Sequence, residues 1–179
     1  DGSLAGPRTL EHLVDTVLML EGDRYGSLRL LRALKNRHGS TEEVGVLEMT
    51  AAGLAEVKDT AAAFLGSGRR EAPGVAVAAV LEGRRPLLVE VQALVDESPL
   101  ANPRRVTLGL EQNRLSMLLA VLHRHCGIAM YDQDVYVNVV GGVRITETAA
   151  DLAVLLAVLS SFRDRVVPAD LAAFGEVGL

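Results

Sequence analysis

Two cations, Lys35 and Arg37, stand in a short turn-forming segment, Lys35-Asn36-Arg37-His38-Gly39. Apolar runs that resemble strands lie on both sides, so the segment is predicted to form the turn of a β-hairpin. Side chains alternate along a strand, and two cations separated by one residue therefore share a face and reach one anion together. The alternative interpretation is a solvated hairpin tip whose charges discourage edge-to-edge pairing.

Arginines form the second group of candidate residues, and they occur mostly in pairs. The sequence contains Arg69-Arg70, Arg84-Arg85 and Arg104-Arg105, together with Arg114 near the start of a predicted helix. We expect Arg104, Arg105 and Arg114 to contact DNA phosphates, because they cluster near one helix start. A local basic patch, repeated in each subunit of an assembly, can outweigh an acidic average charge of the chain. The alternative is an ordinary solvated surface.

A third group, His-Arg-His-Cys at residues 123–126, contains residue types that bind metals. Helical spacing places His123 and Cys126 on one side, but no further residue completes a set of ligands. We therefore predict no metal site and interpret these residues as the last turn of a helix. Cys126 is the one cysteine of the sequence, so an internal disulfide is excluded.

The composition restricts the classes of function. The chain has 179 residues, 49% of them hydrophobic, with a net charge of −5, a pI of about 5.4 and no Trp. It can bury a core, but it has few aromatic side chains for stacking on bases, and DNA binding would need a local basic patch. Its most apolar stretch, residues 152–159, is too short to cross a bilayer, so we expect no membrane contact. The single cysteine suits a reducing compartment, and we expect a cytoplasmic location.

These residues need strands and helices to position them. The first part is predicted to be β-rich, with a helical turn at residues 7–11, a buried strand at 13–20 and further strands at 28–34 and 44–49. The second part is predicted to contain strands at residues 75–81, 86–95, 135–140 and 174–179, a helical turn at 169–172, and helices at 110–125 and 148–162. The fold class is therefore α/β (α+β), with helices packed on a sheet.

The motif and its surroundings resemble one known family. "KNRHG", between "GPRTLEHLVDTVLMLEGD" and "EVGVLEM", is similar to the KNRFG motif of the RadA/Sms family of bacterial DNA repair and recombination proteins. "GLEQNRLSMLLAVLHRHCGI", "DQDVYVNVVGGVRITETAADLAV" and "SSFRDRVVPADLAAFGEVGL" resemble the Lon-protease-like domain of that family. The similarity covers nearly the whole chain in the expected order.

The resemblance implies a division of the chain. Residues 1–64 would be the last strands of a RecA-like ATPase core, 65–73 a linker, and 74–179 a Lon-like domain that is incomplete at its C-terminus. Both ends are expected to be cut. In the full-length family protein, ATP and Mg²⁺ bind the core, and zinc binds only an N-terminal finger that this chain lacks. The chain contains no G-x-x-x-x-G-K-[ST] loop, so we expect it to bind none of these and to be inactive alone.

The resemblance also implies roles for single residues. Lys35 and Arg37 would contact the γ-phosphate bound by a neighbouring subunit of a ring. His38 stands where the family usually has Phe, which weakens a packing role at that position and leaves both cations in place. Ala149, in "ETAAD", occupies the position of the serine nucleophile of Lon-type proteases, so the Lon-like domain is expected to be proteolytically inactive.

The predicted function is that of a fragment of an ATP-dependent DNA motor. The family processes recombination intermediates by branch migration, on single-stranded and branched DNA and together with a recombinase. The Lon-like domain would assemble the ring, a homohexamer, and bind DNA. The alternative is a non-catalytic oligomerisation scaffold with no DNA contacts of its own.

Overall fold

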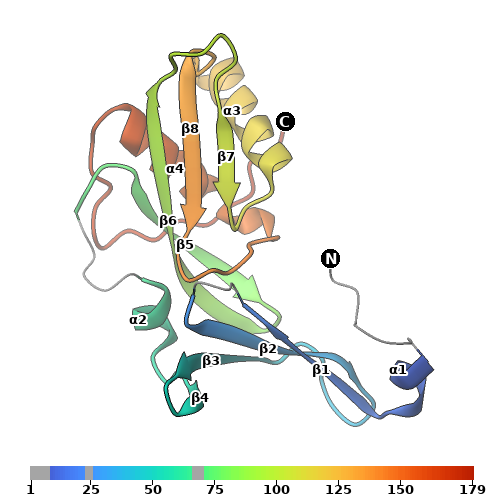
Figure 1. Cartoon of the computed structure of the whole chain (residues 1–179). Coiled ribbons are helices and arrows are strands. Elements are labelled where there is room, and N and C mark those ends of the chain that lie inside the picture. Colours follow the sequence, from blue (N-terminus) through green and yellow to red (C-terminus); the bar gives the residue numbers. More distant parts are fainter. Residues whose placement is uncertain (1–8, 23–25, 66–70) are drawn as a thin grey trace.

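The computed structural model describes residues 9–22, 26–65 and 71–179, and these residues form two four-stranded sheets (Figure 1). Sheet A is antiparallel, with the order β1 (Thr16–Glu21), β2 (Leu28–Asn36), β3 (Val44–Thr50) and β4 (Gly53–Glu56). Sheet B has the order β5 (Val75–Glu82), β6 (Arg85–Glu97), β8 (Gln133–Val139) and β7 (Arg105–Leu108). The mixed α/β class is confirmed.

Helices cover one face of sheet B and flank sheet A. They are α1 (Thr9–Leu13), α2 (Thr60–Phe64), α3 (Gln112–Cys126), a 3-10 turn (Thr148–Ala150) and α4 (Asp151–Phe162). The helix α3 connects β7 to β8, which are parallel neighbours, and its buried stripe is the predicted one, Leu115, Leu118, Leu119 and Leu122. The α3 helix ends at Gly127, whose φ of +66° is the left-handed cap conformation.

Sheet A buries only one of its faces. Leu28 and Leu30 of β2 and Val46 of β3 are buried against sheet B, whereas Leu18 of β1 is 58% exposed on the opposite face. The predicted buried strand at residues 13–20 is therefore wrong in two respects: the strand is Thr16–Glu21, and its residues alternate between exposed and half-buried. The continuous apolar run indicated burial on both faces, but only one face has a neighbouring layer.

Three short elements were absent from the sequence prediction. They are β4, α2 and β7, with four, five and four residues. Elements of this length show at most two periods of any hydrophobic pattern, so local contacts decide them instead. The helix α2, for example, begins where the Asp59 carboxylate accepts a hydrogen bond from the backbone N–H of Ala62 at 3.0 Å. In the predicted linker, residues 66–70 lie outside the described part of the chain, and Arg69-Arg70 lie there too.

The predicted last strand at residues 174–179 does not form, and the predicted helical turn at 169–172 is limited to a single turn at 169–170, closed by the hydrogen bond from the Leu171 N–H to the Pro168 carbonyl at 3.1 Å. Ala173 makes a single parallel bridge to Ala78 of β5. Beyond it the chain crosses the start of α4, where Gly175 donates its N–H to the Ala149 carbonyl at 2.7 Å. The alternating apolar residues resemble a strand, but the backbone N–H groups of Gly175 and Val177 donate to acceptors at the start of α4 and not to a neighbouring strand.

The two sheets share one hydrophobic core. The side chain of Phe64, from α2, is fully buried in it. A Cβ atom at Gly141, just after β8, would lie 2.7 Å from the Phe64 ring, so glycine lets the ring approach the backbone there. The long β5–β6 hairpin extends from sheet B to sheet A (Figure 1). The position of sheet A is therefore fixed by packing as well as by chain connection.

Candidate functional site

The KNRHG turn, residues 35–39, is shaped by its asparagine. The Asn36 side chain accepts a hydrogen bond from the backbone N–H of His38 at 3.2 Å and donates one to the Ser40 carbonyl at 3.3 Å. A Cβ atom at Gly39 would lie 2.8 Å from the Asn36 amide nitrogen. Asn36 and Gly39 therefore determine the shape of the turn, a structural role that was not predicted from the sequence.

The two cations of the turn differ in setting. The strand β2 continues through Asn36, so half-buried Lys35 is a strand residue and exposed Arg37 follows the strand end. The expectation that strand alternation aligns both side chains therefore does not apply to Arg37. The Lys35 ammonium donates to the Glu11 carbonyl at 2.5 Å, and Arg37 forms an ion pair with Asp15 at 3.0 Å. Both cations bind the segment that precedes β1, each at its own acceptor.

The structure does not bring the three candidate DNA-contact arginines together. The Arg114 guanidinium hydrogen-bonds both carboxylate oxygens of Asp151, which is 2% exposed, with an Nε–Oδ1 distance of 2.8 Å. Those hydrogen bonds outweigh desolvation and raise the pKa of Arg114. The Arg105 guanidinium donates to the backbone carbonyls of Met130 and Gln133, and its burial lowers its pKa.

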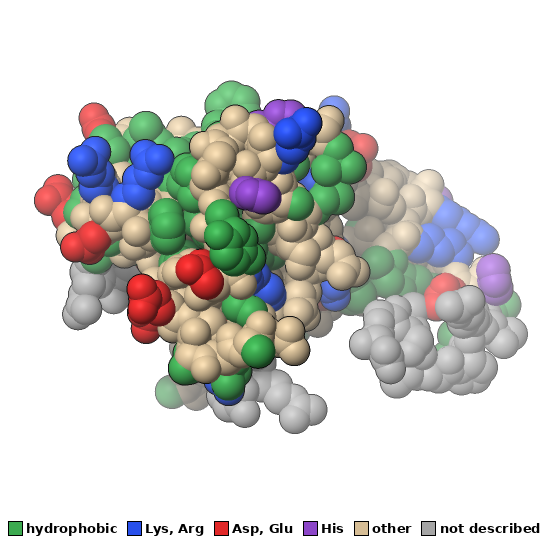
Figure 2. Space-filling view, turned by 90° about the horizontal axis from the view of Figure 1, so that it is seen from above, with side chains coloured by type: hydrophobic (Ala, Val, Ile, Leu, Met, Phe, Trp, Pro, Cys, Tyr) green, Lys and Arg blue, Asp and Glu red, His purple; other side chains and the backbone are tan. Residues whose placement is uncertain are grey.

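Of those three arginines, Arg104 alone has an exposed side chain. Its backbone N–H donates to the Asp134 carboxylate at 2.7 Å. That bond, with the hydroxyls of Ser98 and Tyr136, lowers the pKa of Asp134 although burial raises it. Figure 2 shows Lys and Arg side chains on the face it presents in separate groups, with acidic side chains nearby, rather than in one continuous patch.

Ala149 lies in the 3-10 turn that leads into α4, a helix start as the resemblance implied. Its methyl group supplies no nucleophile, and its carbonyl accepts the Gly175 N–H described above. At the end of α3, the His123 ring makes an edge contact with Tyr131, 6.5 Å between ring centroids, and the Cys126 thiol is exposed. No cluster of three or more metal-binding side chains occurs in the described residues, and none of their helices is long and apolar enough to span a membrane.

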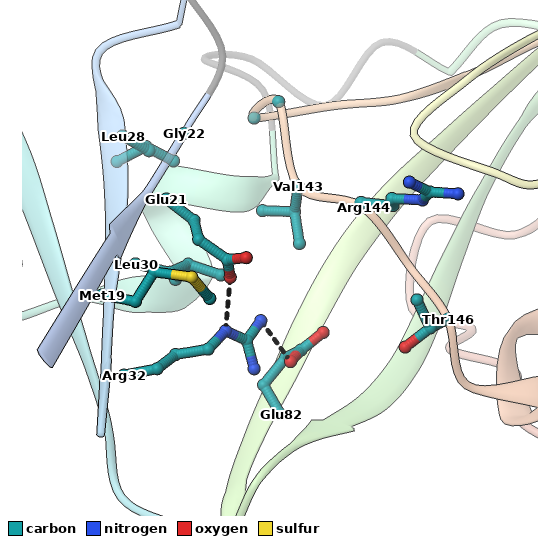
Figure 3. A pocket seen from close by; sticks show the side chains of 12 residues that line it. Met19, Glu21, Gly22, Leu28, Leu30, Arg32, Glu82, Val143, Arg144 and Thr146 are labelled. Atoms are coloured by element: carbon teal, nitrogen blue, oxygen red, sulfur yellow. Dashed lines mark hydrogen bonds and ion pairs between the residues drawn. The ribbon is translucent and has the colours of Figure 1, made fainter. Parts of the chain in front are cut away.

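A cleft of about 430 Å³ lies between part of sheet A and the end of sheet B, and it contains a group of ion-paired side chains around Arg32 that sequence inspection missed. Arg32 of β2 lies between Glu21 of β1 and Glu82 of β5, with an ion-pair distance of 2.7 Å to each (Figure 3). The side chain of Arg144 points away from this group (Figure 3). The available indication was a charged residue inside an apolar strand, but one of its partners, Glu82, comes from a distant part of the sequence.

The whole chain is similar in sequence to known DNA repair proteins. It is 64% identical to the DNA repair protein RadA of Pseudomonas aeruginosa, 61% to that of Escherichia coli and 48% to that of Bacillus subtilis. Each match covers 100% of this chain and 39–40% of the relative. The predicted resemblance to the RadA family is confirmed.

No family model matches the sequence. The chain spans about 40% of the length of the curated RadA relatives it matches, which are named as DNA repair proteins. The RadA relatives therefore contain a large further region that this chain does not cover. Within the described part of this chain, the KNRHG turn is the site where an exposed cation, Arg37, a half-buried one, Lys35, and the segment that resembles the family motif coincide.

Proposed function

We propose that this chain is part of an ATP-dependent DNA repair and recombination motor, in which Lys35 and Arg37 contact the nucleotide bound by a neighbouring subunit. The observation that carries the proposal is the match to RadA over all 179 residues, with the motif cations on a surface hairpin. Processing of recombination intermediates by branch migration, a hexameric ring, single-stranded or branched DNA, a partner recombinase and a cytoplasmic location belong to the same proposal.

The chemistry of the turn suits a phosphoryl group. Guanidinium and ammonium groups form charge-assisted hydrogen bonds with phosphate oxygens, and ATP with its Mg²⁺ supplies the phosphoryl chemistry when bound. The chain has no phosphate-binding loop, so the rest of the protein would hold that nucleotide. Lys35 and Arg37 would then add positive charge from outside the nucleotide site, and this chain would have no ATPase activity alone.

The present partners of the two cations can be exchanged for a phosphate at low cost. Arg37 and Asp15 are 55% and 59% exposed, and exposed ion pairs contribute only about 0–1 kcal/mol. The Lys35 ammonium is bound to one backbone carbonyl, and an ammonium has three donors. Neither contact resembles the buried bidentate pair of Arg114 and Asp151, which would be costly to separate.

The test is a chimera in which this chain replaces the aligned region of the Pseudomonas aeruginosa relative. We expect the chimera to show ATPase activity that DNA stimulates and to restore DNA-damage survival to a radA deletion strain. Lys35→Ala and Arg37→Ala should each lower kcat at least about tenfold, as loss of a transition-state charge contact does. Lys58→Ala, at an exposed lysine between β4 and α2, is the matched control. Full activity of both turn variants would overturn the proposal.

A second candidate, a scaffold whose DNA contacts lie outside this chain, is favoured by the net charge of −5. Arg104 separates the two candidates because its side chain is exposed, while Arg105 and Arg114 bind internal acceptors. If this chain binds DNA through Arg104, the variant Arg104→Ala in the chimera should weaken DNA binding and reduce the salt slope by about one unit. An unchanged slope would favour the scaffold.

A further inference from the structure

The tip of the β5–β6 hairpin, residues 82–85, reaches the loop that follows the KNRHG turn. The backbone N–H of Arg84 donates to the Glu42 carbonyl at 2.9 Å, and its guanidinium pairs with the Glu42 carboxylate at 3.2 Å. Arg85 donates to the carbonyl of Val44, the first residue of β3, at 3.2 Å. The outgoing side of the turn is therefore bound to sheet B, largely through backbone atoms.

Gly83 makes this approach sterically feasible. Its φ is +60°, and a Cβ atom there would lie 2.1 Å from the Glu42 carbonyl oxygen. No side chain fits at that distance unless the loop moves, because backbone atoms give way less readily than the end of a side chain. The spacing between the hairpin tip and the loop is thus set by the absence of one methyl group.

The incoming side of the turn is bound to the same hairpin tip through Arg32. Arg32 precedes Lys35 on β2, and its guanidinium pairs with Glu82 as well as Glu21. The Glu82 side chain is 10% exposed and that of Arg32 is 25% exposed, so this pair is better shielded from solvent than the Arg37 pair. Burial alone would lower the pKa of Arg32, but the hydrogen bonds and charges of Glu82 and Glu21 outweigh it and raise the pKa.

We propose that the β5–β6 hairpin tip, Glu82 to Arg85, positions the KNRHG turn and thereby couples sheet B to the cations Lys35 and Arg37. This inference rests on the proposed function, because it gives Glu82, Gly83, Arg84 and Arg85 a role in that same site. They are positioning residues, since each acts through the backbone or strand that carries the cations and not on a nucleotide.

Two features separate positioning from ordinary packing. The contacts flank the turn on both sides, and among the described residues no hydrogen bond or ion pair joins the exposed residues 37–40 to the tip, so the tip restrains the two ends of a projecting loop. Surface loops of this kind are otherwise among the first segments to open locally. A displacement of the β5–β6 hairpin would therefore move Lys35 and Arg37 together with it.

The test compares Gly83→Ala with Gly127→Ala. Both glycines have a left-handed φ, +60° and +66°, but a Cβ atom at Gly127 meets nothing within 4 Å. The two variants therefore share the backbone penalty and differ in the collision with the loop. Arg85→Ala is the second variant, because it removes the hydrogen bond to the Val44 carbonyl without changing the Gly83-Arg84 turn of the hairpin. Arg85→Lys keeps a cationic donor and should restore the behaviour of the unmodified chain in part.

Amide hydrogen exchange of residues 37–44 in this chain is the first readout. We expect Gly83→Ala and Arg85→Ala to accelerate it at least about tenfold, as local opening does, and Gly127→Ala to leave it unchanged. The second readout is ATPase activity of the chimera, where both variants should lower kcat about tenfold with KM within about twofold, because a misplaced group loses transition-state contacts. A thermal melt confirms that each variant folds.

The outcomes separate this inference from the proposed function. Unchanged hydrogen exchange in Gly83→Ala and Arg85→Ala overturns the positioning role, whatever the ATPase rate. Faster exchange with an unchanged kcat also overturns it, provided that Lys35→Ala and Arg37→Ala lower kcat. If Lys35→Ala and Arg37→Ala leave kcat unchanged, the proposed function fails. The hydrogen-exchange data for Gly83→Ala and Arg85→Ala then decide whether the tip restrains the turn.

Discussion

Arg37, which follows β2 of sheet A, and Arg114 of α3, which packs on sheet B, use the same side chain in opposite ways. Arg37 pairs with an acid that is itself more than half exposed, whereas Arg114 pairs with Asp151, which is 2% exposed. The first pair can dissociate into water, while the second, once separated, would leave an uncompensated buried carboxylate. The exposure of the partner, more than that of the arginine, therefore separates a cation available to another molecule from one that holds the fold.

The comparison extends to the hydrophobic residues. Sheet B is covered by α3 and α4, and Leu118 of α3 has no exposed surface. Sheet A buries one face and leaves Leu18 and Leu54 about half exposed on the other. A substitution on the exposed face of sheet A should thus cost little stability in this chain, whereas one in the core beneath sheet B should cost much more. The predictions below test this contrast.

The largest effect is expected for Arg114→Ala. It should lower the free energy of unfolding by about 3–5 kcal/mol, because it leaves the Asp151 carboxylate buried without its charge partner. Urea denaturation of this chain measures the loss. Arg124→Ala, on the same helix with an exposed side chain, is the control and should stay within about 0.5 kcal/mol. A loss below about 1 kcal/mol for Arg114→Ala would contradict the structural role.

The next effect concerns the core. Leu118→Ala should cost about 2–5 kcal/mol, because it removes a fully buried side chain and leaves a cavity between α3 and sheet B. Leu54→Ala in β4 should cost under about 1 kcal/mol, since its side chain is 48% exposed. Thermal unfolding of both variants checks the difference, and equal losses would show that sheet A is packed as tightly as sheet B.

An intermediate effect is expected for the pH dependence of stability near Asp134. Its folded-state pKa lies below the unfolded value, so its contribution is present above about pH 4 and is lost as the pH falls through the folded pKa. Asp134→Asn should reduce stability at neutral pH and flatten the acid limb of a stability profile measured by urea titration. Asp132→Asn, an exposed neighbour, should leave that limb unchanged. Parallel profiles for Asp134→Asn and the unmodified chain would rule out this contribution.

The smallest effect on stability is expected for Arg37→Ala. Its pair with Asp15 is exposed on both sides, so the free energy of unfolding should change by less than about 1 kcal/mol. The same substitution is the one that should lower ATPase activity in the chimera. Measuring both quantities on one variant sharpens the comparison, because a large loss of stability would place Arg37 with Arg114 among the cations that hold the fold.

Hydrophobic periodicity was sufficient for the regular elements and insufficient for their contacts. The helix α3 with its leucine stripe, α4, and strands β2, β3, β5, β6 and β8 follow from the pattern of apolar residues. The predicted hairpin forms as well, but β2 continues through Asn36, so Lys35 lies on the strand and not in the predicted turn. The pairing of Arg114 with Asp151, 37 residues away, does not follow from the pattern, because sequence spacing carries no information on which helices face each other.

The elements that the sequence misplaced share a physical cause. Residues 174–179 have the alternation of a strand, but the start of α4 offers acceptors and a carboxylate that take the N–H groups of Gly175 and Val177. Arg32 and Glu82 were likewise separate charged residues until β2 and β5 were brought together. Tertiary contacts decided each of these cases, and single-sequence patterns do not encode them.

The most direct test of the central claim, that Lys35 and Arg37 act on a neighbouring subunit, is ATPase activity of mixed assemblies of the chimera. One subunit type carries Arg37→Ala and an intact nucleotide site. The other carries the unmodified turn and a substituted phosphate-loop lysine in the region supplied by the Pseudomonas aeruginosa relative. Each should have strongly reduced activity alone, and action across the interface predicts that mixing restores DNA-stimulated hydrolysis. Mixtures that stay as inactive as the separate proteins would contradict the account.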